Sequence, residues 1–184
     1  MCCGTKRLTE IRCPDDCVYL ASAREHPPAV TLRRQQHDTQ SIVQLVRDLN
    51  EKQLQLFLLI ATFLNRYEPA ELHALTDADV AEAAQAMGST FETASRGVIY
   101  EHRPQSLPAE RLAAALKPAL LEAAGHGGSA FERDVAIVLM RIAEGARAAS
   151  GQRTFVDMLR RVFRTDGKEE RREEPHDTPR LIVP

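Results

Sequence analysis

The sequence has no tryptophan, and aromatic residues make up only 5% of its 184 positions. Together with the many alanines, this scarcity argues against a β-sandwich and favours helices. No apolar run approaches the roughly eighteen residues that a membrane-spanning helix requires. The densest run, 54–64, is short and is interrupted by Gln55 and Thr62. We therefore expect an all-α protein that does not enter a membrane.

An excess of charge of either sign is also missing. The 24 basic and 26 acidic residues give a formal net charge of −2. No overall field therefore draws the chain to nucleic acid or to an anionic membrane, and any such binding requires a local basic patch. The N-terminus carries no recognisable secretory signal, so we expect a cytoplasmic protein.

The familiar catalytic motifs are absent as well. The sequence has no Gly-x-Gly-x-x-Gly, no phosphate-binding glycine-rich loop, no His-Glu-x-x-His and no nucleophile elbow. Residues 39–163 also contain no Glu-x-x-His pair, which disfavours a carboxylate-bridged di-iron bundle. Enzymatic activity stays an open question, and a non-catalytic binding protein is the simpler hypothesis.

All the cysteines of the chain are clustered near its start, at Cys2, Cys3, Cys13 and Cys17. In a reducing compartment, clustered cysteines bind metal or serve redox chemistry more often than they form structural disulfides. We expect these thiolates to bind one structural zinc ion. The adjacent first pair and the three-residue gap in the second depart from the usual zinc-ribbon spacing. An iron–sulfur cluster and free or disulfide-forming thiols therefore remain alternatives.

Composition divides the chain into three parts. Residues 1–38 combine the cysteines, as a zinc-ribbon-like or knuckle module, with a basic segment. Residues 39–163 carry helical periodicity and are expected to form the main domain. Residues 164–184 are dominated by charge and contain few apolar residues, so we predict that they are disordered.

The spacing of apolar residues in the middle part predicts an orthogonal or irregular bundle of about five to six helices. Asn50 marks a break between two of them. The helix that follows, 51–67, is apolar on most sides and is expected at the centre of the core. Its apolar stretch 54–64 would supply a dimer face if the core left it uncovered.

Thr76 and Asp79 have the spacing of a capping box, which starts another predicted helix. Its apolar period continues to about Glu101, so we expect the helix to reach that residue. Gly88 and Gly97 fall inside this range and predict a kink or a close contact with a neighbouring helix.

A basic polar stretch follows the cysteines in sequence. Its members are Arg24, His26, Arg33, Arg34, Gln35, Gln36 and His37. A solvated helix face is the simpler interpretation of such a run. Binding of nucleic acid through Arg24, Arg33 and Arg34 is the functional alternative, because arginine contacts phosphate.

A second polar cluster lies at the end of the helix that starts near Thr76. Its members are Glu92, Arg96, Tyr100, Glu101, His102 and Arg103. The first three are four residues apart and are expected to share one face, as in an exposed ion pair. An acid–base role for His102 beside Glu101 is weaker, because neighbours in sequence point in different directions on a helix.

These patterns lead to one main hypothesis and two alternatives. The main one is a non-catalytic, zinc-binding regulatory or adaptor protein, whose metal site fastens the N-terminal segment to the bundle. We expect a protein partner or self-association. The alternatives are an iron–sulfur or thiol redox protein that uses the same cysteines, and a nucleic-acid-binding zinc module.

Overall fold

The computed structural model describes residues 29–69, 74–125, 128–149, 151 and 153–163. Regular structure in these ranges is entirely helical, with six helices and no strand, which confirms the predicted class. The helices are α2 (Ala29–Val46), α3 (Glu51–Arg66), α4 (Asp77–Ser95), α5 (Leu107–Ala124), α6 (Gly128–Ala148) and α7 (Thr154–Val162). No described helix is long and apolar enough to cross a bilayer.

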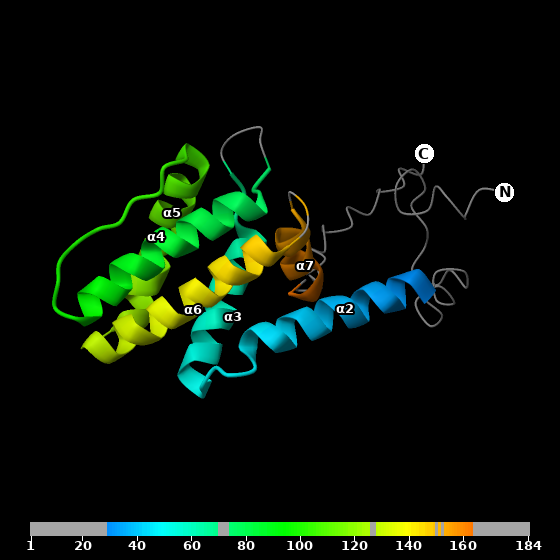
Figure 1. Cartoon of the computed structure of the whole chain (residues 1–184), viewed down its shortest axis with the longest axis horizontal. Coiled ribbons are helices and arrows are strands. Elements are labelled where there is room, and N and C mark those ends of the chain that lie inside the picture. The colour runs from blue at the N-terminus through cyan, green and yellow to red at the C-terminus, as the bar shows by residue number, and fades with distance from the viewer. Residues whose placement is uncertain (1–28, 70–73, 126–127, 150, 152, 164–184) are drawn as a thin grey trace, which may run out of the picture.

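Helices α4 and α6 lie side by side along most of their length and form the central pair of the bundle (Figure 1). Small residues allow their close approach. A Cβ atom built on Gly88 would lie 3.3 Å from the side chain of Met140, which is tighter than ordinary contact. The close helix contact predicted at Gly88 is therefore observed.

The core is built around this pair by α3, α5 and α7. Its largest fully buried side chains include Phe57, Ile60, Leu112, Leu120, Leu139, Ile142 and Leu159. Burial of each such side chain contributes about 1.5–3 kcal/mol to folding.

The predicted central position of the 51–67 helix is wrong in part. α3 buries Phe57 and Ile60 but leaves Leu54 and Leu58 half-exposed. Helices rich in small residues pack most closely, and α4 and α6 therefore take the centre.

The prediction that the Thr76 helix continues to about Glu101 is wrong, because α4 ends at Ser95. Gly97 has φ +80°. Its N–H donates to the carbonyl of Ala94, and the N–H of Val98 donates to that of Thr93. This pair of bonds is a Schellman motif, in which glycine ends a helix. Residues 96–106, called here the connector, then lead to α5.

Helix α7 has an unusual N-terminus. The helix is 9 residues long, and its N-cap residue, Arg153, makes no side-chain capping bond. The buried carboxylate of Asp77, in the first turn of α4, accepts the N–H of Phe155 at 2.9 Å and that of Val156 at 3.0 Å. A residue of α4 therefore caps α7.

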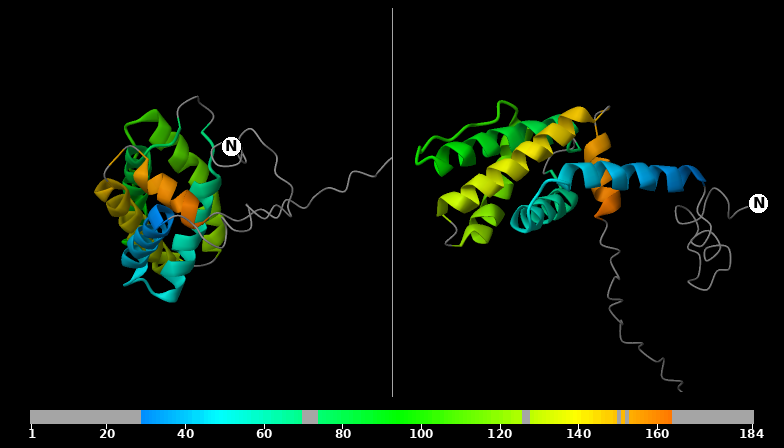
Figure 2. Two further views of the ribbon diagram at one scale, coloured as in Figure 1. Left: turned by 90° about the vertical axis from the view of Figure 1, so that its right-hand side faces the viewer. Right: turned by 60° about the horizontal axis from the view of Figure 1, so that its bottom comes forward.

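Helix α2 crosses α7 and extends beyond the rest of the bundle (Figures 1 and 2). The boundary predicted between residues 38 and 39 falls inside this helix. The division of the chain into a module, a bundle and a tail stays a prediction, because most of residues 1–38 and all of 164–184 lie outside the described residues.

Candidate functional site

The predicted metal ligands cannot be placed. Cys2, Cys3, Cys13, Cys17 and Arg24 all lie outside the described residues. The zinc site, its iron–sulfur alternative and the free-thiol alternative therefore stay predictions. Within the described part of the chain, no three His, Cys, Asp or Glu residues are grouped so as to hold a metal ion.

The first part of α2, residues 29–37, is exposed at every position. We call this stretch the α2 arm. It contains Arg33 and Arg34 and no acidic residue. Even its apolar side chains, Val30 and Leu32, are exposed, so the arm does not bury the apolar face that a helix normally buries. The side chains of the arm are therefore available to a partner.

The second part of α2 is anchored to α7 by an ion pair. Nε of Arg161 donates to Oδ2 of Asp38 at 2.7 Å, and a terminal nitrogen of Arg161 lies 3.2 Å from Oδ1. Asp38 is buried. Its hydrogen bond raises the pKa of Arg161. A bidentate pair of this kind fixes orientation as well as distance.

A close contact with α6 completes the anchor. Leu45 of α2 packs over Gly145, where an added Cβ atom would lie 2.8 Å from Cδ2 of Leu45 and 2.9 Å from Cε2 of Phe155. A hollow of about 560 Å³ remains between α2, α6 and α7, and His37 and Asp38 contribute to its lining.

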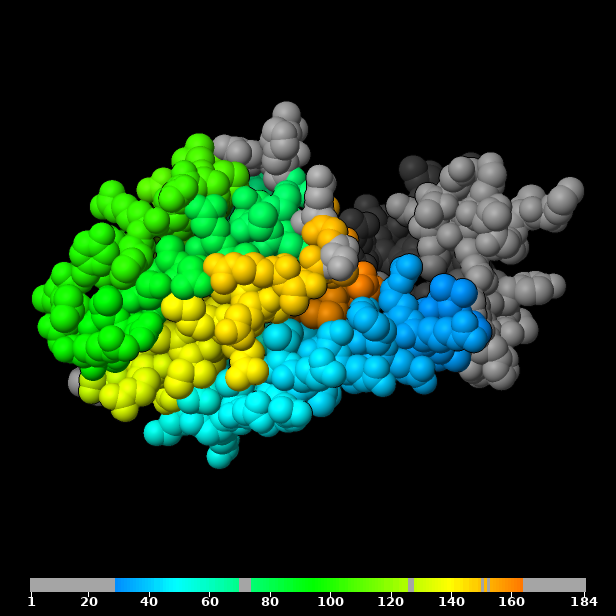
Figure 3. Space-filling view, in the orientation of Figure 1, coloured from blue at the N-terminus to red at the C-terminus, as the bar shows by residue number. Residues whose placement is uncertain are grey.

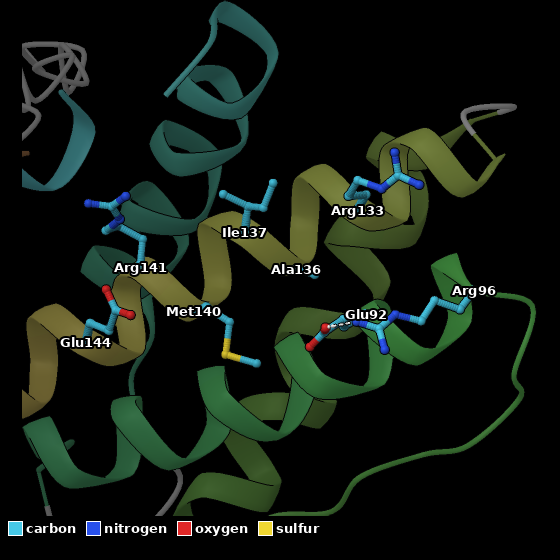
Figure 4. A pocket seen from close by; sticks show the side chains of 8 residues that line it. All are labelled: Glu92, Arg96, Arg133, Ala136, Ile137, Met140, Arg141 and Glu144. Atoms are coloured by element: carbon cyan, nitrogen blue, oxygen red, sulfur yellow. Dashed lines mark hydrogen bonds and ion pairs between the residues drawn. The ribbon is translucent and has the colours of Figure 1, made fainter. Parts of the chain in front are cut away.

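A second hollow, of about 490 Å³, runs between α4 and α6 (Figure 4). Met140 points toward α4, whereas Arg133 and Arg141 lie along the outer side of α6 on either side of Ile137. Neither arginine has a salt bridge with another described residue. Two free guanidinium groups beside a half-exposed isoleucine suit a partner that carries carboxylates.

The two hollows adjoin each other, because Arg141 and Glu144 line both. The space-filling view shows α6 between α4 and α2 on this face of the molecule (Figure 3). The adjoining hollows therefore extend along α6 and reach His37, the last residue of the α2 arm.

The second polar cluster is only partly brought together. Glu92 of α4 and Arg96, the residue just after its end, form the expected ion pair, and both side chains are largely exposed. Tyr100 does not share their face, since the helix has already ended at Ser95. The prediction for Tyr100 was therefore wrong, and its physical reason is the turn at Gly97.

The rest of that cluster belongs to the connector. Glu101 accepts from Nζ of Lys117 at 2.7 Å, and this bond lowers the pKa of Glu101. The rings of His102 and Tyr100 pack edge to face, with their centroids 4.7 Å apart. Glu101 and His102 are not hydrogen-bonded to each other, so the geometry gives no support to an acid–base pair.

Comparison with known proteins gives no match: no family model, no curated protein and no solved structure is significantly similar to this chain. The function is therefore argued from the chain's own residues.

Sequence reasoning missed the anchor of α2. Asp38 occupies the same helical stripe as Ile42 and Leu45, which pack on the core. An acidic residue in register with an apolar stripe is a signal of a buried charge with a partner. That signal was present in the sequence, although the identity of the partner, Arg161, was not.

Proposed function

We propose that this chain is a non-catalytic regulatory or adaptor protein of the cytoplasm, which presents the α2 arm to a partner. Zinc bound by Cys2, Cys3, Cys13 and Cys17 orders the segment that leads into the arm. The supporting observation is that every arm residue is exposed, although the other end of the same helix is firmly anchored.

The energetics of short helices favour this interpretation. An isolated helix shorter than about 12 residues is marginal in water, because nucleation is costly and few hydrogen bonds offset it. The α2 arm is continuous with an anchored helix, which supplies the nucleus. It gains no stability from burial, however, so an ordered segment ahead of it or a bound partner would stabilise it further.

A chelation experiment tests the link between metal and arm. Full-length protein is purified under reducing conditions, its zinc and iron are measured, and amide hydrogen exchange is followed with and without chelator. We expect about one zinc per chain and faster exchange in residues 29–37 after chelation. Residues 51–66 of α3 are the internal control and should not change.

The outcomes separate the alternatives. A brown protein with visible absorption and bound iron favours the iron–sulfur protein. Absence of both metals removes the metal site from the proposal. Zinc at full stoichiometry, with exchange in the arm unchanged by the chelator, contradicts the proposed coupling between metal binding and the α2 arm. As a control, a variant with serine at all four cysteine positions should reproduce the effect of the chelator.

Nucleic-acid binding is the second candidate, favoured by the two arginines of the arm and its lack of acidic residues. An α-helix about 10–12 Å across fits the major groove of DNA, which is about 12 Å wide. The nine exposed positions 29–37 would enter it without steric hindrance from the bundle.

A salt titration tests this candidate with labelled duplexes and single strands. Changing Arg33 and Arg34 together to alanine should reduce the dependence of log affinity on log salt by about two units, one for each lost phosphate contact. Arg47→Ala is the matched control, since Arg47 is an exposed residue just after α2. An equal effect of the control, or no binding at low salt, excludes the α2 arm as a nucleic-acid site.

A further inference from the structure

A cavity of about 450 Å³ lies between the connector, α4 and α5. We call it the connector cavity. Its volume falls within the range of about 300–1,000 Å³ that is typical of small-ligand sites. One part of its lining is apolar and consists of Met87, Phe91, Ala94, Ala113, Ala114 and Leu121. These residues offer a surface for the apolar body of a small molecule.

The two cationic side chains in the lining, Lys117 and Arg103, both lie close to the carboxylate of Glu101. Lys117 is bound to Glu101 at 2.7 Å. Arg103 lies 3.9 Å from the same carboxylate, and its side chain is 76% exposed. Both cations therefore have a partner in Glu101, and solvent screens Arg103 strongly.

Two other carboxylates in the lining have no such ion-pair partner. Glu110 and Glu132 also face the cavity, and neither forms an ion pair with another described residue. Glu132, on α6, is half-buried, whereas Glu110, on α5, is exposed. A partly desolvated carboxylate without a counter-charge is unfavourable, and a cation that entered the cavity would relieve it.

The wall also contains an unmet hydrogen-bonding group. Nε2 of His102 is buried and has no hydrogen-bond partner among the described residues. The backbone N–H of His102 is held by Oγ1 of Thr90 at 2.9 Å, so the residue is fixed in place. Buried polar atoms are nearly always satisfied, and an exception in a cavity wall is a place where a ligand or water completes the structure.

We propose that the connector cavity binds a small organic amine, whose apolar body packs on Phe91, Ala113 and Leu121 and whose ammonium group is held by Glu132. This inference goes beyond the proposed adaptor function, because it gives the bundle a small-molecule site on α4, α5 and α6, away from the α2 arm. It does not depend on the cysteines or on zinc.

Three probes of similar shape and different charge test the proposal: benzylamine, benzyl alcohol and benzoate. Each is titrated into the full-length protein, and binding is followed by NMR shifts of the methyl groups of Ala113 and Leu121. We expect benzylamine to bind about tenfold more tightly than benzyl alcohol, the difference expected for one charge-assisted hydrogen bond of about 1.4 kcal/mol. Benzoate should bind least.

Two pairs of variants locate the site. Glu132→Gln should remove the tenfold preference for benzylamine while leaving benzyl alcohol unaffected, and Glu122→Gln, an exposed position on α5 outside the lining, should preserve it. Ala114→Phe should fill the cavity and block all three probes. Ala115→Phe is its control, because the adjacent Ala115 is exposed and does not line the cavity.

Several results would overturn the inference. Benzoate binding as tightly as benzylamine excludes a cation site. The same loss of binding in Ala114→Phe and Ala115→Phe places the probes elsewhere. If millimolar benzylamine produces no NMR shifts at Ala113 and Leu121, the amine does not bind in the connector cavity. If Glu132→Gln disturbs the fold, as judged by circular dichroism, Glu132→Ala provides the charge test.

Discussion

Replacing Asp77 with alanine tests the most specific contact of the fold. Asp77 is 2% exposed, and its two carboxylate oxygens accept the N–H groups of Phe155 and Val156. These groups belong to the first turn of α7, which its own N-cap residue leaves without a side-chain acceptor. Truncation therefore leaves two donors unsatisfied at the end of a short helix.

The expected cost follows from those two bonds. Each buried donor that loses its partner costs about 1–3 kcal/mol, and water entering the space left by the carboxylate recovers part of it. We expect Asp77→Ala to lower the free energy of unfolding by about 2–4 kcal/mol, a large share of the roughly 5–15 kcal/mol of a typical domain. Asp77→Asn keeps one acceptor oxygen and should cost about half as much.

The assay is urea unfolding, combined with hydrogen exchange at the amides of Phe155 and Val156. Asp79→Ala is the control, because it removes only the local capping box with Thr76, worth about 1 kcal/mol. Asp77→Ala should also speed exchange in α7 more than in α3. Equal costs for the two alanine variants, or unchanged exchange in α7, would refute the role of Asp77 as a remote cap.

Three further predictions concern other contacts. Gly145→Ala should destabilise the protein by about 1 kcal/mol or more, because the new Cβ overlaps Leu45 and Phe155, whereas Gly88→Ala meets only the flexible Met140 and should be nearly neutral; thermal unfolding compares them. Asp38→Ala should loosen α2 and cost about 1–2 kcal/mol, since Arg161 is partly exposed, and exchange in residues 38–46 should rise. Hydrogen bonds from the Ser106 side chain and from the backbone N–H groups of Ser106 and Gln105 lower the pKa of Glu82 below 4.5. A lowered pKa in the folded state stabilises it above the unfolded value and loses this effect as pH falls. The stability difference between wild type and Glu82→Gln should thus be present at pH 7 and shrink below about pH 4.5, as measured by urea unfolding at several pH values.

Features encoded locally were predictable from the sequence. Asn50 and Thr76 both form capping boxes, with Gln53 and Asp79. In each case the interacting groups are three residues apart, so spacing alone identifies them.

The end of α4 was missed for a different reason. Val98 continues the apolar period of Phe91 and Ala94, so the pattern runs past the point where Gly97 turns the backbone. Periodicity describes which residues are apolar and does not register a change of φ.

Contacts between residues far apart in the chain could not be predicted from the sequence. Asp77 meets α7 across 78 residues, and Asp38 meets Arg161 across 123. Asp77 already has a local explanation, since acidic residues are favoured in the first turn of a helix. The connector cavity is equally non-local, because Glu110, Ala114 and Glu132 come together only when α5 and α6 have packed.

The remote cap of α7 sets an order of assembly. A helix of 9 residues does not persist alone, so α7 forms only when the start of α4 is in place to receive it. Arg161 of α7 then holds Asp38 and thereby fixes the direction of α2. We therefore expect α2 to dock late in folding and to detach early in unfolding. Damage to α4 near Asp77 would then reach α2 through α7 and change the direction of α2.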